Sequence, residues 1–182
     1  HVFSGWTGEW QTLTTGPGAS VTIGRDLLLC LDLQASTGPR AIAVRALDGL
    51  RVDQPLSASS PSTQPLVDIS DGLAVLRDDD SLYAFSAYLD QWISTPAPAN
   101  VRATSPVQIS DRSPCYAVFE TQRGFECLSS RTGELTLVGS SLTSWVWRST
   151  TLGVFVEPTG EQVVYSALTG EAARVPAGQS VR

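Results

Sequence analysis

The sequence contains no lysine and no methionine, and its single histidine is His1. All twelve basic residues are arginines, and eighteen acidic residues leave a net charge of −6. An acidic surface repels nucleic-acid phosphates and anionic lipids, so we expect neither as a partner. No apolar run approaches the roughly 18 residues that a membrane-spanning helix needs, so we expect no membrane span.

The scarcity of histidine also restricts the chemistry of the chain. A Ser-His-Asp system is not expected, because the only histidine is the first residue. An N-terminal histidine suggests a copper brace, but that site needs a second histidine, so we interpret His1 as a processing remnant. Gly16-Pro17-Gly18 is a turn rather than a phosphate-binding loop. We therefore predict a non-catalytic protein with no metal and no cofactor.

The three cysteines, Cys30, Cys115 and Cys127, all lie in apolar runs, and the sequence has no C-x-x-C pair. Free cysteine is among the most buried residue types, so we expect three buried thiols. A Cys115–Cys127 disulfide is the alternative.

Against these absences, the sequence contains a strong internal repeat. Five segments share an apolar residue, a small or polar residue, a small residue, two variable residues and a turn. Phe3–Glu9 and Tyr165–Glu171 are examples. We call the second residue of each segment the anchor, and the anchors recur every 37–43 residues. They are Ser4, Arg45, Ser86, Ser129 and Ser166.

Two apolar segments precede each complete anchor segment, and another short segment follows it. In the first complete repeat these are Val21–Ile23 and Leu27–Leu31, and in the third they begin with Val107–Ile109. β-Branched and aromatic residues fill the segments, turn residues separate them, and no window has helical periodicity. The sequence therefore predicts an all-β protein of four-stranded antiparallel units. Tandem units of about 40 residues are typical of a β-propeller, which we expect to span residues 1–182 as one domain.

The stretch Leu82-Tyr83-Ala84-Phe85-Ser86-Ala87, followed by Trp92, resembles the blade motif of pyrroloquinoline-quinone-type propellers. Phe3–Trp10 and Tyr165–Gly170 are similar to the second half of that motif. The resemblance implies the propeller fold. It implies no quinone site, because the aspartate of the motif is serine or arginine at every anchor.

The chain holds four complete repeats and half of another. We predict a ring of five blades. The alternatives are a four-bladed ring with an accessory hairpin, and an arc of blades that another chain completes. An unpaired sheet edge promotes aggregation, so some form of closure is expected.

Acidic residues offer two further candidate sites. Asp78-Asp79-Asp80 is interpreted as a solvated hairpin tip rather than a cation site. A general acid/base pair would have to come from residues near strand ends, and Asp71 and Asp111 are more typical of a repeated turn. The four candidates are Asp26, Asp68, Asp71 and Asp111.

The aromatic residues are the best candidates for a binding surface. Trp10, Trp92, Trp145 and Trp147 are expected to pack between blades. Trp6 occupies a variable position of the repeat, which predicts an exposed residue. Trp6, Tyr88 and Arg131 share that position and are the predicted binding residues.

These features favour an interaction module that binds a protein on one rim of the propeller. The first alternative is a glycan-binding propeller with one unique site, because an indole ring stacks on a sugar. A glycoside hydrolase is the second. The composition slightly favours an extracytoplasmic location.

Overall fold

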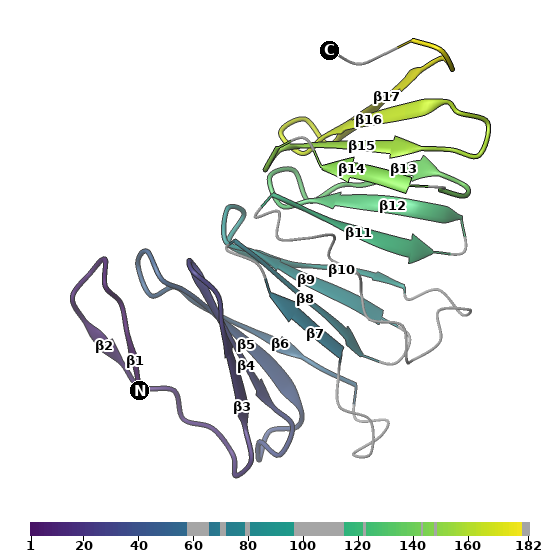
Figure 1. Cartoon of the computed structure of the whole chain (residues 1–182). Helices are drawn as coiled ribbons and strands as arrows, with labels where there is room; N and C mark the ends of the chain where they lie inside the picture. The colour runs from purple at the N-terminus through teal and green to yellow at the C-terminus, as the bar shows by residue number, and fades with distance from the viewer. Residues whose placement is uncertain are drawn as a thin grey trace. The chain divides into compact units, whose positions relative to one another are not determined.

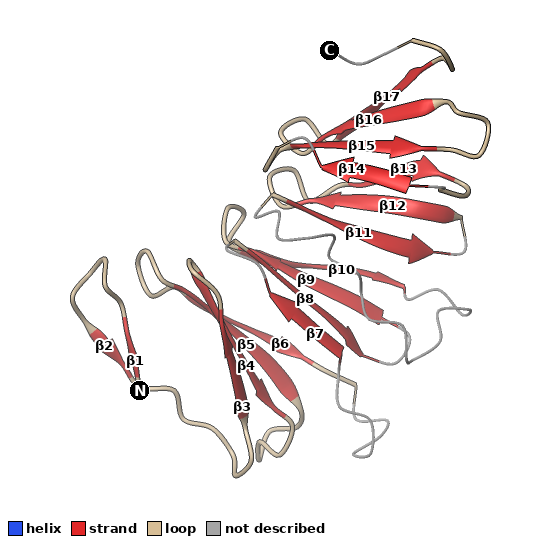
Figure 2. Cartoon of the chain, in the orientation of Figure 1, coloured by secondary structure: helices blue, strands red, loops and turns tan. Residues whose placement is uncertain are grey.

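The computed structural model describes residues 1–57, 66–69, 72–78, 81–96, 115–121, 123–142, 144–147 and 149–179. Within these residues the chain forms seventeen β-strands and no helix (Figure 2). The all-β prediction is therefore confirmed. The chain divides into two compact units, His1–Pro96 and Ala97–Arg182, and each is described by itself.

The first unit contains a two-stranded sheet and two four-stranded sheets, all antiparallel (Figure 1). Each four-stranded sheet is a meander, because strands adjacent in sequence are also adjacent in the sheet. The strands are β1 (Val2–Phe3) and β2 (Trp10–Gln11); β3 (Ser20–Ile23), β4 (Leu27–Asp32), β5 (Arg40–Arg45) and β6 (Arg51–Pro55); and β7 (Leu66–Ile69), β8 (Leu73–Asp78), β9 (Ser81–Ser86) and β10 (Gln91–Pro96).

The second unit continues the pattern with a three-stranded and a four-stranded meander. Their strands are β11 (Tyr116–Thr121), β12 (Gly124–Ser129) and β13 (Leu135–Gly139); and β14 (Ser144–Trp147), β15 (Leu152–Val156), β16 (Gln162–Ser166) and β17 (Glu171–Val175). The strand expected at Val107–Ile109 lies outside the described residues.

Repeated four-stranded meanders of about 40 residues are the blades of a propeller, so the predicted fold class is confirmed at the level of the blade. The β1–β2 sheet is the half-repeat found in the sequence, and we call it the half-blade. The number of blades, the closure of the ring and the single domain over residues 1–182 stay predictions.

The core of the first unit forms where the two faces of β4 are both covered. Leu27, Leu29 and Leu31 point to one side and pack in a cluster with Ala74 and Leu76 of β8. Leu28 and Cys30 point to the other side and form a cluster with residues of β5, against which Val2 of the half-blade packs. Because both faces are buried, β4 is a continuous apolar run rather than an alternating one.

The second unit is built in the same way. A cluster that includes Tyr116, Val118 and Cys127 packs with Phe155 and Tyr165 of the last sheet. The rings of Tyr116 and Tyr165 meet edge to face, with centroids 5.6 Å apart. Burial raises the pKa of both phenols above its ordinary value.

All three cysteines are buried thiols, as predicted. The alternative Cys115–Cys127 disulfide is wrong, because neither residue forms a disulfide bond. Cys115 lies directly before β11 and Cys127 lies within β12, and both contribute to the apolar cluster of the second unit. Burial also raises the pKa of the Cys30 and Cys127 thiols.

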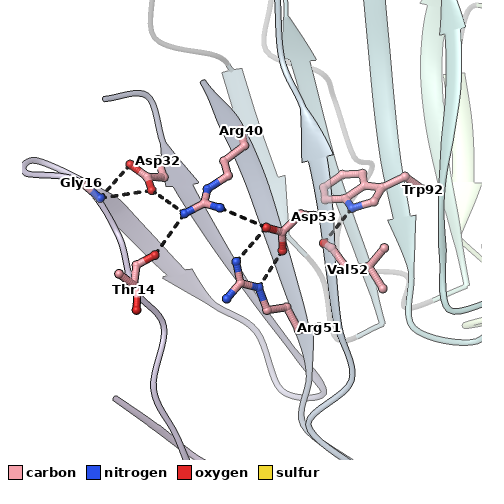
Figure 3. Close-up of polar contacts among 8 residues, drawn as sticks. All are labelled: Thr14, Gly16, Asp32, Arg40, Arg51, Val52, Asp53 and Trp92. Atoms are coloured by element: carbon pink, nitrogen blue, oxygen red, sulfur yellow. Dashed lines mark hydrogen bonds and ion pairs between the residues drawn. The ribbon is translucent and has the colours of Figure 1, made fainter. Parts of the chain in front are cut away.

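One charged network lies at the end of β4 and holds the segment between the half-blade and β3 (Figure 3). The buried carboxylate of Asp32 accepts two hydrogen bonds of 3.1 Å from the Gly16 amide and pairs with Arg40 at 3.2 Å. Arg40 also donates to the Thr14 carbonyl and pairs with Asp53. A side chain at Gly16 would meet the Gln34 carbonyl oxygen at 2.6 Å, so this position needs glycine.

Candidate interaction surface

The anchors begin five tight turns of the same geometry. In each turn the amide four residues after the anchor donates a 2.9 Å hydrogen bond to the anchor carbonyl. The donating residue has a positive φ of 58–75° in every case, which is why glycine fills four of the five positions. The donors are Gly8, Gly49, Asp90, Gly133 and Gly170.

The anchor side chains tie neighbouring repeats together. The hydroxyl of Ser4 donates to the Ala46 carbonyl at 2.5 Å. Ser129 donates in the same way to the Ala167 carbonyl at 2.6 Å. In both cases the acceptor is the residue directly after the next anchor. The same hydroxyls also accept amide hydrogen bonds from their own turns, so one small side chain caps a turn and fixes the position of its neighbour.

Arg45, the one anchor that is not a serine, also forms a hydrogen bond with the next repeat. Its Nη1 atom donates to the Ala87 carbonyl at 3.2 Å, which is again the residue after the next anchor. The guanidinium also pairs with Asp48 of its own turn and with Asp90 of the following one. The hydrogen bond with Arg45 lowers the pKa of Asp48 to about 2.

A second connection links the same turns. Gln11 donates to the Gly49 carbonyl at 2.7 Å, and Thr136 donates to the Gly170 carbonyl at 2.5 Å. Gln11 and Thr136 occupy the same place, seven residues after their anchors. Successive turns within a unit are therefore held by polar contacts as well as by the apolar core.

This arrangement places three exposed apolar side chains in sequence along one end of the first unit. Trp6, Leu47 and Tyr88 each lie two residues after an anchor, and 71%, 55% and 39% of their surfaces are exposed. The turns that carry them, between β1 and β2, β5 and β6, and β9 and β10, lie at the same end of their sheets (Figure 1). We call these three residues the apolar row.

The matching positions of the second unit are Arg131 and Leu168. Arg131 is exposed, and Leu168 is 57% exposed. Their turns are joined by the bond from Ser129 to Ala167. The exposure expected at the variable position is thus confirmed for Trp6, Tyr88 and Arg131, while their role in binding stays a prediction. Trp6 and Tyr88 belong to one unit, and Arg131 belongs to the other.

The apolar row is flanked by charge. Glu9 is exposed beside the first turn, and Asp48 and Asp90 lie in the second and third. Arg45 pairs with both aspartates, so these four groups together leave a net negative charge. A surface of this kind favours a partner that offers apolar side chains together with basic ones.

The expectation that Trp10 packs between blades is wrong, since 70% of its surface is exposed. Trp92, at the equivalent position, confirms the same expectation. It packs on the buried Phe85 with ring centroids 5.5 Å apart and donates to the Val52 carbonyl of the preceding sheet. Trp10 packs on Phe3 at 5.1 Å in the same way. Phe3 is itself 51% exposed, so none of the described sheets of the first unit covers the pair.

The other candidate residues are placed only in part. The side chains of Trp145 and Trp147 lie outside the description, as do residues 79–80, Asp71, Asp111 and the side chain of Asp68. Asp78 ends β8, where its carboxylate accepts hydrogen bonds from Ser57. Asp26 lies between β3 and β4, and its carbonyl accepts the Ala46 amide. His1 shares a 2.9 Å hydrogen bond with the Thr12 hydroxyl.

In the described ranges, no three histidine, cysteine or acidic residues gather as the ligands of a metal would. In the same ranges, the chain has no helix of the length and apolarity that would cross a bilayer.

Sequence reasoning missed two features of this surface. It did not include Leu47 among the binding residues, although Leu47 shares the position of Trp6. It also gave the anchor serines no role, although serine recurs at four of the five anchors. The recurrence of serine could have indicated this role, because a repeated small hydroxyl is typical of a side chain that forms hydrogen bonds with nearby backbone groups.

No family model and no curated protein matches the sequence. Similar solved structures include Kluyveromyces lactis Hsv2p, with 13% identity, a TM-score of 0.39, and coverage of 85% of this chain and 50% of that one. HIRA(644-1017) has 11% identity and a TM-score of 0.44, and the match covers 86% of this chain and 55% of that one. BamB from Moraxella catarrhalis has 13% identity and a TM-score of 0.30, and the match covers 82% of this chain and 45% of that one. The chain spans about half the length of these structures. The blade assignment rests on the strand pairing of the chain itself.

Proposed function

We propose that this chain is a non-catalytic interaction module that binds a protein partner through the apolar row and the turns around it. The observation that carries the proposal is the exposure of Trp6, Leu47 and Tyr88 at one equivalent position of three successive repeats. Scattered apolar residues are normal on a protein surface. An ordered series on rigidly connected turns is a feature of binding sites, and tryptophan and tyrosine are enriched among the residues that contribute most binding energy.

The connections between turns support the proposal physically. Each turn is closed by its own backbone hydrogen bond, and neighbouring turns are linked by Ser4 and Arg45. Binding to a preformed surface loses little conformational entropy, because the residues that contact the partner are already ordered. The acidic residues Glu9, Asp48 and Asp90 further favour a partner segment that carries basic residues beside its apolar ones.

Glycan binding at Trp6 is the alternative. An indole that is 71% exposed offers a face on which a sugar ring can stack. The following repeats carry leucine and tyrosine at the same position, which argues against a series of identical sugar sites. We also propose that the repeats are related to the blades of quinone-type propellers. This proposal concerns the fold of the blade and includes no quinone site.

The test compares three immobilised proteins as baits in extract from the source organism. They are the native chain, a Trp6→Ser/Leu47→Ser/Tyr88→Ser variant, and a Leu137→Ser/Leu152→Ser control. Leu137 and Leu152 are each 41% exposed and lie outside the row, so the control also removes exposed apolar surface. We expect a partner that the native chain and the control retain and the row variant loses. Equal retention by all three would overturn the proposal.

A glycan array with the same three proteins separates the alternative. Binding to one sugar class that is lost with the row variant would replace the protein partner with a carbohydrate. No glycan binding, together with a captured protein that depends on the row, is the expected result.

A further inference from the structure

The second and third turns of the first unit, which carry Leu47 and Tyr88, cannot be joined by the neutral contacts found elsewhere. Between the first two turns, and between the two turns of the second unit, an anchor serine donates to the residue after the next anchor. The residue seven positions after the anchor donates to a carbonyl of the next turn as well. Here the anchor is Arg45 and the seventh position is Val52, whose side chain has no hydrogen-bond donor.

Arg45 replaces both contacts with one side chain. Its Nη1 atom donates to the Ala87 carbonyl at 3.2 Å, where a serine hydroxyl donates in the other pairs. The guanidinium also pairs with the carboxylate of Asp90, the residue whose carbonyl the second contact would reach. Its Nε atom donates to Asp48 of its own turn at 2.9 Å. The planar guanidinium holds its partners in a fixed geometry, so Arg45 joins the two turns through side chains as well as backbone.

Asp90 is a second departure from the repeat, and it contacts the first. The other four turns have glycine at this position. In the described ranges, Asp90 is the one residue other than glycine with a positive φ, which is 58°. The left-handed conformation is unfavourable for residues with a Cβ atom, although aspartate tolerates it better than most. This cost is accepted at the turn where the side chain pairs with Arg45, and residues kept in such conformations cluster at functional sites.

The packing of the two sheets that carry these turns does not depend on Arg45. Apolar residues of both sheets form one buried cluster, and Trp92 joins the sheets by its hydrogen bond to the Val52 carbonyl. The carboxylate side chains of Asp48 and Asp90, by contrast, are 46% and 40% exposed. Loss of Arg45 should therefore loosen the turns relative to each other and leave the sheets packed.

We propose that Arg45 is a positioning residue of the apolar row. Its contacts hold the turns of Leu47 and Tyr88 in the relative position that the partner recognises, so that the two side chains bind together. This inference rests on the proposed function, and it adds the residue through which two members of the row act as one surface. Holding the turns in advance reduces the conformational entropy that is lost on binding.

The positive charge of Arg45 separates positioning from simple attraction. Arg45 pairs with the acidic residues beside the row, so replacing it with alanine makes this surface more acidic. Electrostatic attraction alone would then predict stronger binding of a basic partner. Positioning predicts weaker binding, because the two row residues are no longer held together. The two effects have opposite signs, so the alanine variant distinguishes them.

The first experiment measures the two turns in the absence of a partner. Spin labels are attached to cysteines introduced by Leu47→Cys and Tyr88→Cys, in a brief reaction that leaves the three buried thiols unmodified. Pulsed electron paramagnetic resonance then gives the distribution of distances between the labels. We expect a broader distribution when Arg45→Ala is added. A control pair at Arg131→Cys and Leu168→Cys, whose turns are joined by a serine hydroxyl, should not respond to Arg45→Ala.

A rescue variant tests whether the connection or the charge matters. Arg45→Ser/Val52→Thr/Asp90→Gly copies the neutral contacts of the second unit, where Ser129 and Thr136 donate to the next turn. It removes one positive and one negative charge, so the net charge of the chain is unchanged. We expect a label distribution as narrow as that of the native chain. If Arg45→Ala does not fold, Arg45→Lys replaces it, because an ammonium group keeps the charge but lacks the planar fork.

The second experiment repeats the bait comparison in extract from the source organism. Arg45→Ala and the rescue variant are added, with Arg51→Ala as a control that removes an arginine and its ion pair with Asp53 from the same sheet. The readout is the protein that the native chain retains and the row variant loses. We expect Arg45→Ala to reduce its retention by about fivefold or more, the loss typical of an important interface residue. The rescue variant should restore retention, and Arg51→Ala should leave it unchanged.

The outcomes separate this inference from the proposed function. Equal retention by the row variant and the native chain would remove the proposed function and this inference with it. Loss with the row variant, together with full or increased retention by Arg45→Ala, would overturn this inference alone. An unchanged label distribution in Arg45→Ala would do the same. Loss with both Arg45→Ala and the rescue variant would show that the guanidinium contacts the partner directly, which is not positioning.

Discussion

Arg45 donates a hydrogen bond to the carbonyl oxygen of Ala87, and this single contact replaces the serine hydroxyl that joins neighbouring repeats elsewhere in the chain. The distance between the atoms is 3.2 Å, against 2.5 Å for Ser4 and 2.6 Å for Ser129. Two different side chains, Ser4 and Arg45, thus donate to carbonyl groups at equivalent positions of successive repeats. The position of the acceptor is set by the backbone of the neighbouring turn, so the repeat preserves the contact rather than the residue type.

Ser129→Ala should destabilise the second unit. The change removes a fully buried hydroxyl that donates to Ala167 and accepts from the amides of Arg131 and Thr132. Leaving such groups without partners costs about 1–3 kcal/mol each. Urea unfolding measures the loss, with Ser141→Ala as the exposed control. Equal midpoints for the two variants would contradict the role of the anchor hydroxyl.

Asp48 should contribute to stability only while it is ionised. Its pKa is about 2 in the folded protein, below the ordinary value of 3.8, because of its hydrogen bond with Arg45. A lowered folded-state pKa gives stabilisation that is present above the unfolded pKa and is lost as the pH falls toward the folded one. Asp48→Asn should therefore lower the urea midpoint at pH 6. Near pH 2 the difference between the variant and the native chain should shrink, and a difference independent of pH would refute this coupling.

Gly170→Ala should cost more stability than Gly8→Ala. Both glycines have a positive φ, which costs an alanine about 1–2 kcal/mol. A Cβ atom at Gly170 would also meet the Thr132 hydroxyl at 2.7 Å and a Glu134 carboxylate oxygen at 2.8 Å, whereas Gly8 has no atom within 4 Å. Thermal unfolding of the two variants makes the comparison. A larger effect at Gly8 would show that the contacts between turns are looser than described.

Trp92→Phe should destabilise the chain, and Trp10→Phe should change its stability by less than about 0.5 kcal/mol, as exposed substitutions do. Trp92 packs on Phe85 and donates to Val52, while Trp10 is largely exposed. Quenching by acrylamide provides a second measurement. The fluorescence lost with Trp10 should be readily quenched and that lost with Trp92 poorly quenched, and the opposite result would reverse the burial of the two rings.

The three thiols should react slowly with a water-soluble disulfide reagent in the native protein and quickly in urea. All three are buried, and burial raises the pKa of Cys30 and Cys127, which leaves little thiolate to react. Fast labelling of the native protein would contradict the burial of the thiols.

The sequence by itself determined the class of fold, the four-stranded repeat and the positions of the five turns. These features are local. Strand propensity, turn residues and the spacing of the anchors are written within each repeat of about 40 residues, so they can be recognised without knowing what the repeat packs against. Buried cysteines and an exposed residue two positions after the anchor followed from the same local pattern.

Only the tertiary structure decided which equivalent residues are covered. Trp10 and Trp92 occupy the same position of the repeat, yet Trp10 is exposed and Trp92 packs against the core. The reason is that a residue between blades is buried by the neighbouring sheet and not by its own. The hydrogen bond from each anchor side chain to the next repeat could not be predicted for the same reason. Its acceptor is a backbone carbonyl about 40 residues away, and every residue type has such a carbonyl.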